Sequence, residues 1–140
     1  MNIADITPDE ELKSLLDGKV AVDEVQTVVP VYRDGERPSS SWPEDFLEVS
    51  FNGNVRSQTK PLGCVRGTVM VSYFTKLKPS GEIRHSRINK VLSQFEAIVR
   101  GAVGDKFFYD ITPNDFVTPP TASRSTGYSF MYLNVEWHTK

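Results

Sequence analysis

Hydrophobic residues recur along the chain at spacings that distinguish helices from strands. Between residues 82 and 100 the steps are three and four, which is the period of an amphipathic helix. The apolar positions of this helix are Ile88, Val91, Leu92, Phe95, Ile98 and Val99. Residues 65–75 are rich in valine and aromatic side chains, and residues 128–137 alternate, so both segments predict strands.

The expected final strand, residues 128–137, has two distinct faces. One face carries Met131, Leu133, Val135 and Trp137. The other carries an aromatic row made of Tyr128, Phe130 and Tyr132. Such a row on a sheet can stack nucleic-acid bases, or it can pack beneath a helix.

The amino-terminal part predicts a shorter helix. Thr7 is expected to cap it, with Pro8 in its first turn and Glu10 completing a capping box. Gly18 is expected to end the helix. The apolar stripe of this helix is formed by Leu12, Leu15 and Leu16.

The remaining elements complete the fold class. Further strands are expected at residues 20–33, 46–51, 107–111 and 114–117. Pro30 has no backbone N–H, so the first of these is interrupted or lies at a sheet edge. Asn52-Gly53 predicts a hairpin turn, and polar loops are expected at 34–43, 54–62 and 119–127. This order predicts an α+β fold in a single domain, residues 1–140, with a mostly antiparallel sheet, an N-terminal helix and one long helix packed on the sheet.

Composition narrows the class of protein. The chain has 140 residues, of which 39% are hydrophobic and 24% charged, which is typical of a globular domain with its own core. Cys64 is the single cysteine, so an intramolecular disulfide and a thiolate metal cluster are excluded. The first residues lack the features of a secretory signal. No apolar stretch reaches the ~20 residues of a membrane helix, so we expect a soluble protein made in a cytoplasm.

Charge is distributed unevenly along the chain. From Met1 to Glu48 there are 12 acidic and 4 basic residues, whereas from Val49 to Lys140 there are 6 acidic and 12 basic residues. The whole chain carries a formal net charge of −2. This asymmetry is compatible with an acidic and a basic face that meet between neighbouring subunits. The simpler interpretation is that the two halves neutralise each other within one fold.

The sequence offers no recognisable catalytic constellation. His85 and Ser86 are adjacent, so on a helix their side chains point about 100° apart and cannot pair as base and nucleophile. The glycines of residues 101–106 are too close together for a phosphate-binding loop. We therefore expect no enzymatic activity, no cofactor and no metal site.

Basic residues along the long helix are the main candidates for binding. Arg84, Arg87 and Lys90 lie roughly on one face near its amino end, where the helix dipole disfavours cations. An acidic partner or phosphate groups would offset that cost. The alternative is a solvated helix face with long flexible side chains.

The central strand and helix resemble a known viral family. The stretch from Val65 to Thr75, the turn Lys78-Pro79-Ser80-Gly81 and a helix carrying Ser86, Val91, Leu92 and Phe95 resemble the tail terminator (tail completion) proteins of long-tailed bacteriophages. The resemblance implies a structural virion protein at the head–tail junction. It would form a ring, expected as a homo-hexamer, that caps the tail tube, stops its polymerisation and presents the head-joining surface.

The resemblance also implies partners and contacts. The expected partners are further copies of the chain, the tail tube protein and the head–tail connector, with DNA only as cargo and with no small-molecule substrate or membrane. Cations expected to touch a neighbouring subunit or the tube are Arg84 and Arg87, or a loop group of Arg56, Lys60 and Arg66.

Other functions fit parts of the same pattern. A head-closure, connector or tail tube subunit of the same virion would share the small α+β fold. A small nucleic-acid-binding module is the alternative from another class. That module would need the Arg84 face or the aromatic row to be exposed.

Overall fold

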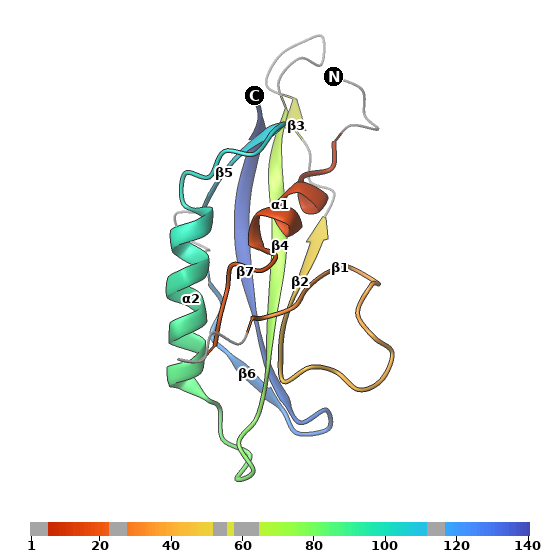
Figure 1. Ribbon diagram of the computed structural model, residues 1–140, viewed down its shortest axis with the longest axis vertical. Helices are drawn as coiled ribbons and strands as arrows, with labels where there is room; N and C mark the ends of the chain where they lie inside the picture. Colours follow the sequence, from red (N-terminus) through yellow and green to blue (C-terminus); the bar gives the residue numbers. More distant parts are fainter. Residues whose placement is uncertain (1–5, 23–27, 52–55, 58–64, 112–116) are drawn as a thin grey trace.

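The computed structural model describes residues 6–22, 28–51, 56–57, 65–111 and 117–140, and it has the predicted α+β fold. Its helices are α1 (Pro8–Leu16) and α2 (His85–Val99). Its strands are β1 (Val31–Arg33), β2 (Asp45–Phe51), β3 (Arg56–Ser57), β4 (Val65–Lys76), β5 (Phe107–Ile111), β6 (Thr121–Ser123) and β7 (Tyr128–Thr139) (Figure 1).

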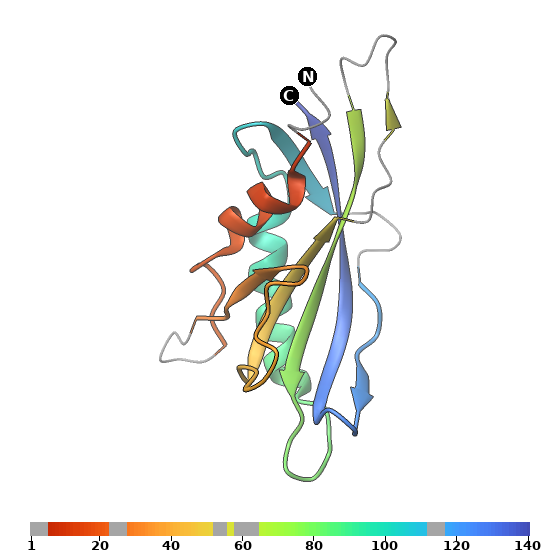
Figure 2. The ribbon, with the colours of Figure 1, turned by 90° about the vertical axis from the view of Figure 1, so that its right-hand side faces the viewer.

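The sheet is built around the long antiparallel pair of β4 and β7. The strand order is β1-β2-β4-β7-β5, with β3 paired to β4 and β6 paired to β7. All pairings are antiparallel except that of β1 with β2, which is parallel. Both helices lie on one side of the sheet (Figure 2).

Alternation along the strands places the core on the helix side of the sheet. Val71 and Tyr73 of β4 face Leu133 and Met131 of β7, and all four are buried. The predicted stripe of α2 packs on this surface, since Ile88, Val91, Phe95 and Val99 are buried and Leu92 and Ile98 are partly buried against it. The sequence prediction for α2 and for the buried face of β7 is therefore confirmed.

The predicted capping box of α1 is wrong, although the helix does begin at Pro8. Thr7 makes no side-chain cap hydrogen bond. The neighbouring carboxylates serve tertiary contacts instead. Asp9 accepts from Arg33 at 2.9 Å, and the Glu11 carboxylate accepts from the backbone N–H groups of Lys106 and Phe107.

The strand expected over residues 20–33 is also corrected. Among the described residues of this segment, only a bridge between Ala21 and Val28 and the short β1 have strand pairing. Pro30 cannot donate to a ladder, but its carbonyl accepts from the Leu47 N–H at 2.9 Å. The Asn52-Gly53 turn, Lys60, Cys64 and residues 114–116 lie outside the described residues.

Candidate functional site

The amino end of α2 borders an open hollow of about 480 Å³. Its lining residues are Val22, Lys78, Arg84, Ser86, Arg87 and Lys90. The helix begins there without a side-chain cap and with no acidic residue in its first turn. The positive end of the helix dipole and the cationic side chains therefore add to the same positive potential.

Arg87 is held by a buried network rather than left free in this hollow. Its guanidinium lies 2.7 Å from Asp45 Oδ2 and 3.7 Å from the Glu44 carboxylate. Asp45 is 4% exposed, and its Oδ1 accepts a 2.9 Å hydrogen bond from the Tyr73 hydroxyl. Burial, together with the Asp45 charge, raises the pKa of Tyr73 above its ordinary value. Arg87 thus joins the start of α2 to the start of β2.

Arg84 and Lys90 are the more available cations of the hollow. Arg84 is half-buried, and its Nε has no hydrogen-bond partner among the described residues. Lys90 is exposed. Lys78, also exposed, lies 3.9 Å from the Glu82 carboxylate, a distance at which an exposed ion pair is weak.

Two of the other predicted cation positions, Arg66 on β4 and Arg56 on β3, lie at the opposite end of the molecule. Arg66 is exposed near the start of β4, opposite Arg56 on β3 and His138 on β7. The hollow follows the end of β4, so the ten strand residues after Arg66 separate the two groups. Lys60 lies outside the described residues. The structure therefore brings Arg84 and Arg87 together and does not bring Arg66 to them.

The aromatic row lies on the side of the sheet that faces away from the helices, so it does not pack beneath a helix. Tyr128 is buried, Phe130 is half-buried and Tyr132 is 37% exposed. Part of the row joins an aromatic cluster covered by the loop of residues 34–44. This cluster contains Trp42, Phe46, Phe74, Tyr128 and Phe130.

Arg37 holds that loop against the sheet through contacts that no local sequence pattern predicts. Its guanidinium lies 4.7 Å from the Trp42 ring and 5.3 Å from the Phe74 ring. Its Nε also lies 3.4 Å from Oε2 of the buried Glu48. Burial raises the pKa of Glu48 above its ordinary value, and the Arg37 charge opposes this only in part.

We expect Glu48→Gln to become more favourable relative to the wild type as pH rises from about 4 to about 7. A carboxyl whose folded pKa is raised contributes its full stability below the unfolded pKa and loses it as pH rises through the folded pKa. Urea unfolding of both proteins across this range measures the difference. A difference that is flat, or that moves in favour of the wild type, would contradict burial as the dominant effect on Glu48.

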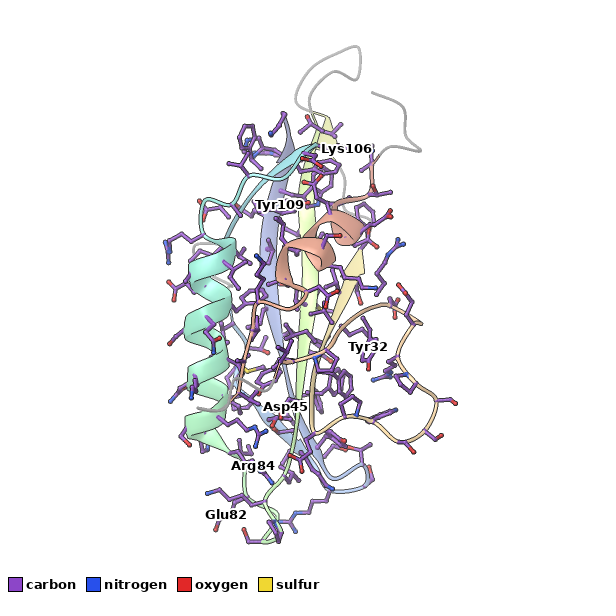
Figure 3. All side chains as sticks on the ribbon, viewed as in Figure 1. Tyr32, Asp45, Glu82, Arg84, Lys106 and Tyr109 are labelled. Atoms are coloured by element: carbon purple, nitrogen blue, oxygen red, sulfur yellow. The ribbon has the colours of Figure 1, made fainter. Side chains whose placement is uncertain are left out.

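Acidic side chains gather beside α1. A second hollow, of about 330 Å³, is lined by Glu10, Lys13, Ser14, Asp17, Arg33 and Glu36. Asp34 is also exposed in the following turn. Figure 3 shows α1 in the half of the molecule near Lys106 and Tyr109, away from Glu82 and Arg84. The acidic residues beside α1 and the cations at the amino end of α2 thus lie in separate regions of the surface, but Arg66 and Lys106 of the basic half of the sequence lie in the same half of the molecule as α1.

Other site types find no support in the described part of the chain. No group of three or more His, Cys, Asp or Glu side chains there is arranged to hold a metal ion. Among the same residues, no helix is long and apolar enough to cross a membrane. The chain matches no protein-family model and no curated protein. A functional proposal therefore rests on the fold and its surfaces.

Proposed function

We propose that the chain is a ring-forming structural protein of a tailed virus, which caps the tail tube, stops its polymerisation and provides the head-joining surface. The ring is expected as a homo-hexamer between the tube protein and the connector. A closed ring leaves no repeating edge for a further ring, provided that its two faces differ.

The observation that supports this proposal is that two unlike charged regions lie apart on one small body. The acidic region beside α1 and the cationic amino end of α2 lie on different parts of the surface. A subunit with unlike ends builds a ring with two unlike faces, and such a ring can join two different neighbours. Opposite charge at these faces would also select the correct partner over a second identical ring.

The helix-free face of the sheet offers a lateral contact in such a ring. Tyr132 is 37% exposed on it, and Phe130 and Met70 are half-buried. Aromatic residues and methionine are enriched in the buried centres of protein interfaces. Arg66 lies toward the other end of this face, and we propose that it contacts a neighbouring subunit or the tube. We propose the same role for Arg56 and Lys60.

Electron microscopy of lysates from the virus lacking this gene tests the proposal. Full heads beside detached, overlong or irregular tails are the expected result, and a wild-type copy supplied in trans should restore complete particles. This control separates loss of the protein from an effect on neighbouring genes.

The other outcomes assign other roles. Normal heads without any tail tubes would contradict termination and indicate a tube subunit. Free tails of correct length would indicate a connector or head-closure protein. Intact particles in normal yield would overturn every virion role for this chain.

A further inference from the structure

Three loops meet at one end of the molecule, which we call the turn end. It comprises residues 38–44, 76–90 and 123–127. Backbone hydrogen bonds join them, from Leu77 N–H to Gly127 O at 2.9 Å and from Lys76 N–H to Glu44 O at 2.8 Å. The Tyr128 hydroxyl donates to Pro43 O at 2.7 Å. In Figures 1 and 2 these loops and the start of α2 lie together at the lower end.

The turn end carries an excess of positive charge. Its cations are Lys76, Lys78, Arg84, Arg87, Lys90 and Arg124, against the carboxylates of Glu44 and Glu82 and of the adjoining Asp45. Asp45 is buried against Arg87, so this pair contributes little to the outer potential. Lys76, Lys90 and Arg124 are exposed, and Arg84 has a buried Nε without a partner among the described residues.

The turn end also carries exposed residues with hydroxyl groups. They are Ser39, Ser40, Ser41, Ser80, Ser86, Ser125 and Thr126. The large exposed hydrophobic side chains of the described residues are Val28, Val103, Val117 and Tyr132, and all of them lie outside the turn end.

We propose that the turn end binds the phosphodiester backbone of nucleic acid without reading its sequence. Arg and Lys side chains, serine and threonine hydroxyls and helix amino ends are the groups that contact phosphate and sugar in such complexes. The hollow beside Arg84 and Lys90 accepts one phosphate group, and the serine loops accept others along the strand.

The turn end resembles the polar rim of a protein interface and not its buried centre. The centres of protein interfaces are enriched in aromatic residues, methionine and arginine and depleted in lysine and serine. The turn end contains arginines but is also rich in lysine and serine, and this combination is closer to protein–DNA interfaces, which are polar and strongly positive. The overall charge of −2 does not oppose this, because screening limits distant charges to about 10 Å at 0.1 M salt.

The test is fluorescence anisotropy of the purified full chain with a labelled 20-nucleotide oligonucleotide, single- and double-stranded, over a series of salt concentrations. We expect a Kd on the order of 1–100 µM near physiological salt, independent of sequence and weakening steeply with added salt. The double variant Arg84→Gln/Lys90→Gln should bind about tenfold more weakly, and its salt slope should fall by about 2.

A matched control removes the same charge from the opposite end. Lys106→Gln/Lys140→Gln changes two exposed lysines there and should leave binding within about twofold, since screening separates the two ends. Thermal melts of all variants confirm that each is folded. Polyglutamate of matched length serves as the acidic-protein competitor and should displace the oligonucleotide poorly.

Three results would overturn the inference: no binding at low salt, equal losses in both double variants, or equal binding of polyglutamate and oligonucleotide. The last would indicate an acidic protein surface as the partner. This inference concerns the chain in any assembly state, so its failure would leave the proposed ring intact. Loss of the ring proposal would equally leave phosphate binding standing.

Discussion

Asp45→Ala is expected to destabilise the protein by about 3 kcal/mol, because it removes one partner from a buried ion pair. The Asp45 carboxylate is 4% exposed and lies 2.7 Å from the Arg87 guanidinium. It also accepts the Tyr73 hydroxyl, whose side chain is buried. Both groups would lose their acceptor, and the first turn of α2 would lose its link to β2. Urea unfolding measures the stability, and amide exchange reports the opening of that turn.

Glu44→Ala is the matched control for this experiment. Glu44 is the adjacent carboxylate on the same guanidinium, but it is 59% exposed and lies 3.7 Å away. We expect this variant to lose less than about 1 kcal/mol, as exposed ion pairs do. If the two variants had equal stability, burial of the Asp45 network would not be what holds α2 in place.

Trp137→Ala is expected to cost about 4 kcal/mol, which is a large part of the stability of an ordinary domain. The indole is 1% exposed near the end of β7. It packs edge-on to Phe107 with centroids 5.2 Å apart, and its centroid lies 6.1 Å from that of Phe51. The truncation leaves a cavity among three strands that rigid neighbours cannot fill. The midpoint of urea unfolding should fall accordingly.

Trp137→Phe is the matched comparison for the packing argument, because it keeps an aromatic ring at this position. The indole Nε1 is buried with no hydrogen-bond partner among the described residues, so phenylalanine removes an unsatisfied donor as well as volume. We expect its cost to be less than half that of alanine. Tyr132→Ala, at a side chain 37% exposed on β7, should change stability by about 1 kcal/mol or less. A cost for Trp137→Phe equal to that of alanine would contradict the packing argument.

Elements whose hydrophobic residues repeat regularly over many positions could be predicted from the sequence. The stripe of α2 and the alternation of β7 depend on neighbours three, four or two residues away, and the core selects the same faces. The strand expected over residues 20–33 includes β1, but the pairing of β1 could not be predicted, because its partner β2 follows an eleven-residue crossover and runs parallel to it. No local pattern encodes such a pairing.

The candidate site likewise combines features that the sequence predicts with contacts that it does not predict. A cationic face on α2 follows from the spacing of Arg84 and Arg87, and the structure places both at one hollow. That Arg87 is engaged by Asp45 depends on a contact between residues far apart in the chain. The separation of Arg66 from Arg84 depends on the length and direction of β4. The sequence indicates the strand but not its direction in the fold.

The contacts that hold the loop of residues 34–44 in place affect the free energy of binding a ligand there. Ser41 has a φ of 59°, a left-handed conformation that is costly for serine, and it lies beside Trp42, whose indole donates to Pro38 O. The loop is therefore ordered before any ligand arrives. The backbone of Ser39, Ser40 and Ser41 loses its conformational entropy during folding. A ligand that binds the hydroxyl groups of these residues therefore loses little affinity to further ordering of the loop.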